Sequence, residues 1–330
     1  MSPWVSRAGP FSWKTARGTA LLLPPARLPR HYAVVTAFSD RYWTSADGLR
    51  LHARDYAPAA GEARLPIICL HGLTRNARDF EALAPHLAAQ GRRVLAVDVR
   101  GRGASDWDPE PGRYLPPVYA GDVLGLMDAA GIARAVFVGT SMGGLITMVL
   151  AALRPAAVAG ACLNDIGPEL ASEGLARIGR YTGKGLEVAD WAGAADYARY
   201  INEAAFPAYG PADWAAFARR VFTEKNGVPV LDYDPAIAIA FKPPEGEPPP
   251  APPDLWPLFQ GLAFTPDKAE RPLLLVRGAL SDLLAPATAD KMRETAPNMA
   301  FAEVPDVGHA PMLDEPEALG AIDAWLKGAP

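Results

Sequence analysis

Apolar and polar positions alternate in blocks along most of the chain, from about residue 38 onward. Four runs are almost continuously apolar and are bounded by Gly, Pro or Asp, at 65–72, 92–99, 133–141 and 157–165. Runs of this kind are typical of parallel strands that are buried on both faces. Segments with helical periodicity separate them, at about 77–90, 117–130 and 142–153. This alternation predicts an α/β fold with a doubly wound sheet.

A hairpin is predicted ahead of the first apolar run. Residues 38–45 and 49–57 alternate apolar and polar side chains, and the Ala46-Asp47-Gly48 segment between them has the chemistry of a turn. We therefore expect two antiparallel strands at the start of the sheet.

The strand–helix rhythm stops near residue 168. Helical stripes follow, and one of them carries apolar side chains at positions 214, 217, 218, 221 and 222. Eight prolines then lie between Pro243 and Pro257, which predicts a stiff polyproline-type surface loop. Aromatic side chains of this block either line an acyl pocket or form the block's own core, and the two readings stay open for Trp191, Trp214, Phe217 and Phe222.

The α/β rhythm returns after this block. Strands are predicted at 272–279 and 301–308, and helices at 286–296 and 316–327. We therefore expect a core formed by residues 38–167 and 266–330. Residues 168–265 would form a helical cap over the functional edge of the sheet.

Residues 1–37 differ from the rest of the chain, with five basic residues and no Asp or Glu. Their apolar patch at 20–26 is short and interrupted by prolines, which argues against a secretory signal. We expect a flexible extension or an upstream translated stretch, with a weak export signal as the alternative. The expected location is cytoplasmic.

Composition narrows the classes of function. Hydrophobic residues make up 50% of the chain and charged residues 21%, with a formal net charge of −5, so we expect a globular protein without a basic nucleic-acid-binding surface. No run of 18 apolar residues predicts a membrane span. Cys69 and Cys162 lie in strand-like apolar runs and are expected to be buried thiols rather than disulfide partners or metal ligands.

The main chemical signal is Gly139-Thr140-Ser141-Met142-Gly143, which matches the pattern G-x-S-x-G. It follows a predicted strand directly and precedes a predicted helix directly. A serine on so tight a turn has a strained backbone and presents its hydroxyl above the carboxyl edge of the sheet. Ser141 is therefore the candidate nucleophile, and a simple glycine-rich turn is the alternative.

A serine hydroxyl needs a base to act as a nucleophile at neutral pH. His309 follows the last predicted strand and precedes a helix that begins near Pro316, so it belongs to a loop at the same edge as Ser141. His52 and His86 are expected to be surface or packing residues. His71 is expected to order a loop by hydrogen bonding.

A base histidine needs an acid to orient it. Asp282 follows the predicted strand at 272–279, and the order Ser141, Asp282, His309 matches the serine–acid–histidine order of one hydrolase architecture. Asp282 is the first candidate. Asp165, which follows the strand run at 157–165, is the rival, with ordering of a hinge to the cap as its other reading.

Acyl transfer also needs N–H groups that stabilise an oxyanion. The residue after the nucleophile, Met142, is one candidate, and Leu73 in the loop after the strand at 65–72 is the other. The glycine-rich stretch at 100–105 is neither a GxGxxG nor a Walker motif, and a tight loop that shapes the floor of the site is expected there.

These segments together resemble the α/β-hydrolase fold superfamily. The resemblance rests on His71-Gly72, 100–105, 139–144, 278–282 and Gly308-His309, and it covers about 38–167 and 266–327. It implies a mostly parallel eight-stranded sheet with a helical cap, and a triad of Ser141, Asp282 and His309. The chain is similar to the capped esterases, lactonases and carbon–carbon bond hydrolases. It has a serine where dehalogenases and epoxide hydrolases have an aspartate, and it lacks the HGGG loop of many lipases.

The leading hypothesis is a serine hydrolase of small-molecule carboxylic esters or lactones that needs no cofactor and no metal. An acyl-enzyme forms on Ser141 and water cleaves it. No nucleic-acid partner is expected, and a homodimer stays open beside a monomer.

Two alternatives stay open for the function. A carbon–carbon bond hydrolase of diketone-type ring-cleavage products would use the same triad, with cap arginines for a substrate carboxylate; the candidates are Arg177, Arg180, Arg199, Arg219 and Arg220. A non-catalytic binding protein of the same fold is an alternative of another class.

Overall fold

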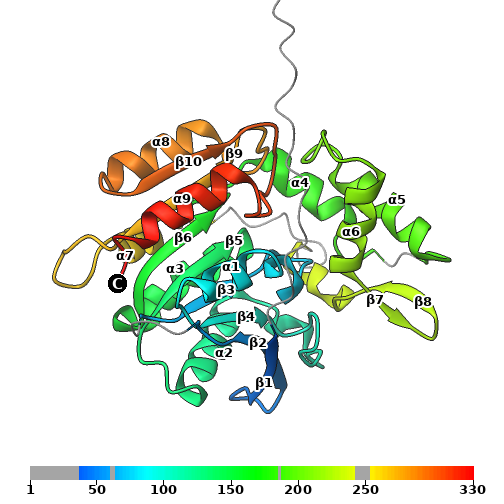
Figure 1. Cartoon of the computed structure of the whole chain (residues 1–330), viewed down its shortest axis with the longest axis horizontal. Helices are drawn as coiled ribbons and strands as arrows, with labels where there is room; N and C mark the ends of the chain where they lie inside the picture. Colours follow the sequence, from blue (N-terminus) through cyan, green and yellow to red (C-terminus); the bar gives the residue numbers. More distant parts are fainter. Residues whose placement is uncertain (1–36, 60–63, 185–186, 242–252) are drawn as a thin grey trace, which may run out of the picture. The chain divides into compact units, whose positions relative to one another are not determined.

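An eight-stranded, mostly parallel sheet forms the centre of the structure (Figure 1). The structure is a computed structural model that describes residues 37–59, 64–184, 187–241 and 253–330. The strands lie in the order β1 (Phe38–Thr44), β2 (Arg50–Tyr56), β4 (Val94–Asp98), β3 (Ile67–Leu70), β5 (Ala135–Thr140), β6 (Val158–Asn164), β9 (Leu273–Gly278) and β10 (Ala300–Val304). The predictions for residues 1–37 and for the run between Pro243 and Pro257 lie largely outside the described residues.

The first two strands account for all the antiparallel pairing in this sheet. β1 pairs with β2 as the predicted hairpin, and β2 also runs antiparallel to β4. Every other neighbouring pair is parallel. The expected mostly parallel, eight-stranded, doubly wound sheet is therefore confirmed.

The central strands bury side chains on both faces, as their continuous apolar character predicts. In β3, Ile68 and Leu70 pack into one core, while Ile67 and Cys69 pack into the core on the opposite face. Cys162 of β6 lies in the same core as Cys69, and both thiols are buried. Burial raises the pKa of each thiol, so both stay protonated at neutral pH.

Helices cover both faces of the sheet. The helices on the face of Ile68 are α2 (Pro116–Ala129), α3 (Met142–Leu153), α7 (Trp256–Ala263) and α8 (Pro286–Thr295). The opposite face carries α1 (Leu83–Ala89) and α9 (Pro316–Leu326). The helices shelter each parallel strand from water on both sides. Because these strands are parallel, the loops at their carboxyl ends lie at one shared edge.

The chain between β6 and β9 contains a separate small group of elements. It comprises α4 (Ser172–Tyr181), α5 (Trp191–Asn202), α6 (Pro211–Val221), β7 (Phe222–Lys225) and β8 (Val228–Leu231). Figure 1 shows them grouped at one side of the sheet, whereas α7 lies at the other side. We call residues 172–231 the insert.

The insert differs from the expected helical cap in two respects. Phe222 begins a β-hairpin instead of continuing a helix, because Asn226 and Gly227 both adopt positive φ (54° and 80°), as a tight two-residue turn requires. At the end of the block that was expected to form the cap, α7 packs on α3, and Phe259 and Leu262 of α7 lie in the core of the sheet. The last helix inside the expected 168–265 block thus belongs to the sheet layers.

Polar contacts join the insert to the loop after β3. Arg78 donates to the carbonyl oxygens of Arg220 and Phe222 and pairs with Asp232 at 2.6 Å. Asn76 donates to the same carbonyl of Arg220 at 2.9 Å. The two side chains hold the insert next to the loop that carries Leu73.

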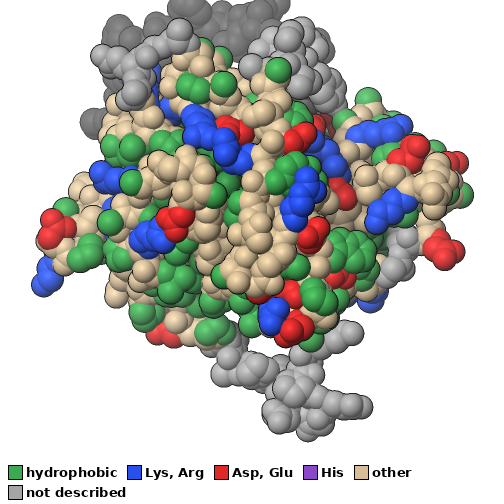
Figure 2. All heavy atoms as spheres, turned by 90° about the horizontal axis from the view of Figure 1, so that it is seen from below, with side chains coloured by type: hydrophobic (Ala, Val, Ile, Leu, Met, Phe, Trp, Pro, Cys, Tyr) green, Lys and Arg blue, Asp and Glu red, His purple; other side chains and the backbone are tan. Residues whose placement is uncertain are grey.

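The surface shows no large field of one charge on the face seen in Figure 2. Lys, Arg, Asp and Glu side chains are interspersed there among apolar ones. This mixed pattern agrees with the formal net charge of −5. Within the described residues, no helix is long and apolar enough to cross a membrane.

Candidate active site

Ser141 occupies the sharp turn between a strand and a helix. β5 ends at Thr140 and α3 begins at Met142, so a single residue makes the turn. Its backbone has φ 51° and ψ −116°, a conformation that non-glycine residues rarely adopt. The strained turn lifts the Ser141 side chain off the sheet, as the G-x-S-x-G pattern predicts.

The glycines of this motif allow the close approach of strand and helix. A Cβ on Gly143 would lie 2.0 Å from the carbonyl oxygen of Leu70, and a Cβ on Gly139 would lie 2.5 Å from the backbone of Gly143. Neither distance is compatible with a side chain. The glycines are therefore required by packing, and the packing fixes the position of Ser141.

His309 lies beside Ser141, in the loop between β10 and α9. Its Nε2 is 2.9 Å from Ser141 Oγ, which makes the histidine the acceptor for the hydroxyl proton. Its Nδ1 is 2.8 Å from Asp165 Oδ2, so an N–H at Nδ1 donates to the carboxylate. The three side chains form one continuous chain of hydrogen bonds.

Asp165 is fully buried directly after β6, and hydrogen bonds hold both oxygens of its carboxylate. Its Oδ1 accepts the backbone N–H of Gly278 at 3.0 Å, and its Oδ2 accepts the Ser281 hydroxyl at 2.6 Å in addition to His309. Its own N–H donates to Val276 at 2.7 Å. Because β6 and β9 are neighbours in the sheet, the end of β9 supplies the Gly278 N–H and the loop after β9 supplies the Ser281 hydroxyl.

Asp282 corrects the expectation from the sequence: its carboxylate does not hydrogen-bond His309. It is held by Arg177 of α4, whose Nε and Nη2 lie 2.6 and 2.9 Å from its two oxygens. Burial alone raises the pKa of Asp282, but the bonds and charge of Arg177 outweigh it and lower the pKa below its usual value. The physical reason is the docking of α4, which places the Arg177 guanidinium against the carboxylate of Asp282. The hydrogen bond to His309 Nδ1 is made by Asp165 instead.

The helix α4 approaches closely at that point. The N–H of Gly174 donates to the carbonyl oxygen of Asp282 at 3.1 Å, and a Cβ on Gly174 would lie 2.7 Å from that oxygen. Arg177 follows one turn later on the same face of the helix. The sequence places both aspartates after adjacent strands, and tertiary contacts distinguish them: Arg177 binds Asp282, whereas Gly278 and Ser281 hold Asp165.

The two expected oxyanion donors lie on either side of a buried arginine. Met142 is the first residue of α3, so its N–H has no partner within the helix. Arg102 donates through Nε to the Leu73 carbonyl at 3.0 Å, and its Nη2 lies 3.7 Å from Met142 Sδ. The tight loop predicted at 100–105 thus positions both residues, a role that the sequence did not assign to Arg102 itself.

His71 orders the Leu73 loop, as expected. Its Nε2 accepts the N–H of Val99 at 3.1 Å, so its Nδ1 carries the proton that bonds the Gly72 carbonyl at 2.7 Å. Complete burial lowers the pKa of His71 to about 4. The imidazole is therefore neutral at physiological pH and acts as a fixed hydrogen-bonding link.

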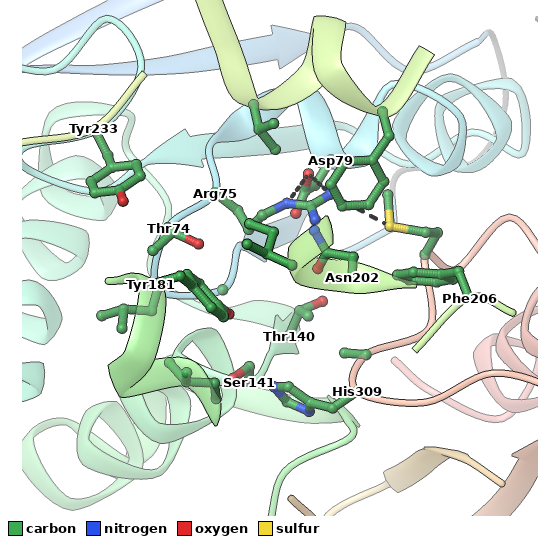
Figure 3. Close-up of a pocket in the computed structure, with 18 of the residues that line it drawn as sticks. Thr74, Arg75, Asp79, Thr140, Ser141, Tyr181, Asn202, Phe206, Tyr233 and His309 are labelled. Carbon is green, nitrogen blue, oxygen red and sulfur yellow. Dashed lines mark hydrogen bonds and ion pairs between the residues drawn. The ribbon is translucent and has the colours of Figure 1, made fainter. Parts of the chain in front are cut away.

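A pocket opens in front of Ser141 and His309 (Figure 3). Its walls come from the loops at the carboxyl edge of the sheet and from the insert. Its apolar lining includes Ile178, Phe206, Phe217, Val221, Leu231 and Met312. Polar groups enter it from Arg75, Asp79, Asn202 and three tyrosines.

The sequence left open whether the aromatic side chains of the insert line the pocket or form the core of the insert, and the structure shows both cases. Phe217 lines the pocket and also packs in the core of the insert. Trp214 and Phe222 are buried in that core, and Trp191 packs against it, without lining the pocket. None of the five arginines considered for a substrate carboxylate is among the lining residues, whereas Arg75, which the sequence analysis did not single out, is.

Comparisons with known proteins agree with the fold. The profile of the alpha/beta hydrolase fold family matches residues 66–182. The 3-hydroxybutyrate-oligomer hydrolase of Cupriavidus necator is 35% identical over 273 residues, which cover 80% of this chain and 88% of that protein. The sn-1-specific diacylglycerol lipase ABHD11 of Mus musculus is 34% identical over 161 residues, 48% of this chain and 50% of its own.

A solved structure is similar over nearly its whole length. The α/β hydrolase of Novosphingobium aromaticivorans superposes with a TM-score of 0.79 at 45% sequence identity, covering 88% of this chain and 98% of that one. The chain belongs to the α/β-hydrolase family, and it is a hydrolase of that fold.

Proposed function

We propose that the protein is a serine hydrolase that cleaves carboxylic esters through an acyl-enzyme on Ser141. The observation that carries the proposal is the hydrogen-bonded series from Ser141 Oγ through His309 to Asp165. Asp165, rather than Asp282, takes the role of the acid. This arrangement is the one that activates a serine in acyl transfer.

The mechanism follows from the donors and acceptors of these groups. Ser141 Oγ attacks the ester carbonyl while its proton passes to His309 Nε2. The bond to Asp165 keeps the second ring proton on Nδ1 and stabilises the imidazolium that forms. His309 then returns the proton to the leaving alcohol, and the ester C–O bond breaks.

The negative charge on the carbonyl oxygen is stabilised by the N–H groups of Leu73 and Met142. Loss of one such donor costs about 3 kcal/mol of transition-state stabilisation in comparable hydrolases. The N-terminal end of α3 adds a favourable dipole at the same point. In the second half-reaction, His309 deprotonates a water molecule that cleaves the acyl-enzyme and releases Ser141.

The substrate class that we propose is a short ester of a hydroxy acid. The relative from Cupriavidus necator, matched over most of its length, is named for hydrolysis of 3-hydroxybutyrate oligomers. A pocket with mainly apolar walls and a few polar groups suits such a chain of short aliphatic units.

The test uses purified protein with the linear dimer of 3-hydroxybutyrate and with p-nitrophenyl butyrate. We expect both esters to be hydrolysed and the Ser141→Ala variant to be inactive on both. A ring-cleavage dienoate is the comparison substrate for the carbon–carbon alternative. Turnover of the dienoate with neither ester hydrolysed would contradict the proposal, and so would full ester turnover by Ser141→Ala.

A further inference from the structure

Arg75 lines the same pocket as Ser141 and His309, on the wall that carries the Leu73 loop. A Cβ on Gly72 would lie 3.6 Å from Arg75 Cγ and 3.7 Å from Ser141 Cβ, so both side chains start from the same point of the wall. From there the Arg75 side chain extends along the pocket toward Asp79 (Figure 3). Because both residues line one pocket, a substrate that extends from Ser141 along this wall meets the guanidinium.

The guanidinium is held in place from three directions. Its Nε and Nη2 both donate to one oxygen of Asp79, at 2.9 and 2.7 Å, and Nη2 lies 3.5 Å from Met312 Sδ. Its central carbon lies 4.2 Å from the centroid of the Phe217 ring. These contacts come from the loop after β3, the loop before α9 and helix α6. An arginine fixed in this way loses little further conformational entropy when it binds a ligand.

One nitrogen of Arg75 is left over by these contacts. Within the described part of the chain, Nη1 has no hydrogen-bond partner, although Arg75 is largely buried, with 15% of its side chain exposed. Two N–H donors of this pocket-lining cation are thus left for a ligand, and a carboxylate oxygen is the acceptor that matches them best.

The other charged groups near the pocket are already paired. Asp79 neutralises Arg75 through a single oxygen, and the carboxylate of Asp165 is bound by Gly278, Ser281 and His309. Asp282 is bound to Arg177 behind the pocket wall. Arg75 is the single lysine or arginine among the described residues that line the pocket. An anionic group bound in the pocket therefore has one cationic partner.

We propose that Arg75 binds a free carboxylate of the substrate, so that the preferred substrates are esters of hydroxy acids that end in a carboxylate. This inference rests on the proposed ester hydrolysis at Ser141 and adds the group that the enzyme selects. In the linear 3-hydroxybutyrate dimer, the carboxylate belongs to the leaving hydroxy acid. Arg75 then holds the leaving half while Ser141 attacks the carbonyl of the other half.

The experiment compares the dimer as free acid with its methyl ester, which differ in the terminal charge. The wild type is expected to show a kcat/KM at least about ten-fold higher for the free acid, since a charge-assisted hydrogen bond is lost in the methyl ester. In Arg75→Met this ratio falls to about one. Arg75→Gln, which keeps a neutral donor, is expected to behave likewise and serves as a second variant if Arg75→Met does not fold.

Arg219→Met is the matched control. Arg219 is exposed on α6, packs on Trp191 and does not line the pocket, so its removal changes the net charge equally and should leave the ratio at the wild-type value. The ratio is insensitive to a general loss of activity, which separates substrate binding from a structural role. Arg75 variants with the wild-type ratio would overturn the inference.

A measurement on the wild type needs no variant. Free 3-hydroxybutyrate is expected to inhibit hydrolysis of the dimer methyl ester competitively, and 3-hydroxybutyramide at least about ten-fold more weakly. Equal inhibition by both overturns the role of Arg75 and leaves ester hydrolysis intact. Failure to hydrolyse either form of the dimer or p-nitrophenyl butyrate would instead mark the proposed function as wrong.

Discussion

Arg177 and Asp282 form a two-bond ion pair, in which the arginine Nε and Nη2 lie 2.6 and 2.9 Å from the two carboxylate oxygens. The pair joins helix α4 of the insert to the loop after β9. Asp282 is the aspartate that the sequence favours as the acid of the triad. In the structure its carboxylate makes this structural contact instead. Asp165 at the end of the adjacent strand has the geometry for that role, with its Oδ2 2.8 Å from His309.

The two aspartates should respond differently to the same substitution. Asp165→Asn keeps the shape of the side chain but allows the wrong tautomer of His309, so kcat is expected to fall about 10³- to 10⁴-fold. Asp282→Asn weakens a contact of α4, and kcat is expected to stay within about ten-fold of the wild type. Steady-state hydrolysis of p-nitrophenyl butyrate measures both. A large loss in Asp282→Asn with a small one in Asp165→Asn would restore the assignment favoured by the sequence.

The glycine at position 143 should be essential for stability. In Gly143→Ala the new methyl group would lie 2.0 Å from the Leu70 carbonyl oxygen, and the backbone shift that relieves this contact is expected to lower the free energy of unfolding by at least about 2 kcal/mol. Urea unfolding followed by circular dichroism measures it.

Gly121→Ala is the control for that substitution. Gly121 lies within α2, and a Cβ there has no atom within 4 Å. The alanine should stabilise the protein by about 0.5–1 kcal/mol, because it reduces the entropy that the helix loses on folding. If both alanines changed the free energy of unfolding equally, close contact between strand and helix at position 143 would not explain the need for glycine there.

His71 should make stability depend on pH. Burial holds the pKa of His71 at about 4 in the folded protein, against about 6.5 in an unfolded chain. Between these values the unfolded state binds the proton and the folded state does not, so stability is complete above pH 6.5 and falls as the pH drops toward 4. The contribution lost is about 3 kcal/mol.

The comparison with His71→Asn isolates this group. The variant lacks the titrating side chain, so its free energy of unfolding should fall less steeply than that of the wild type between pH 6.5 and 4, whatever its absolute stability. Chemical denaturation at a series of pH values gives both slopes. Parallel slopes would mean that His71 is not the buried neutral group described.

Local sequence patterns are sufficient for much of the fold, and they place Ser141 and His309 at the edge of the sheet where the structure brings the two side chains together. Ser141 is identified by a turn between a continuous apolar strand and a helix, a feature contained within a few residues. His309 follows the last strand, and parallel strands deliver such loops to one edge. His71 and the loop at 100–105 are also where the pattern predicts them, because each directly follows a buried strand.

The acid could not be chosen in this way. Asp165 and Asp282 follow neighbouring strands at the same edge, and their own sequences meet the same requirement. What separates them is their tertiary contacts: Arg177 reaches Asp282 because α4 packs on the loop after β9, and Ser281 of that loop binds Asp165. A contact between segments about a hundred residues apart is a property of tertiary packing, which periodicity does not encode.

Two features of the block between β6 and β9 differ from the prediction, and the sequence contains a signal for only one of them. Asn226-Gly227 is a two-residue hairpin turn, and its chemistry is visible in the sequence, although the apolar stripe that ends at Phe222 favoured a helix. The assignment of α7 was not readable. Its apolar side chains fit either layer, and only its packing on α3 places it with the sheet.

Labelling with a fluorophosphonate followed by mass spectrometry tests the central claim most directly. The reagent phosphonylates a serine only when a base activates it. We predict one adduct per chain, on the peptide that contains Ser141, with no adduct in Ser141→Ala and much slower labelling in Asp165→Asn than in Asp282→Asn. An adduct on another residue, or undiminished labelling of folded Ser141→Ala, would contradict the account.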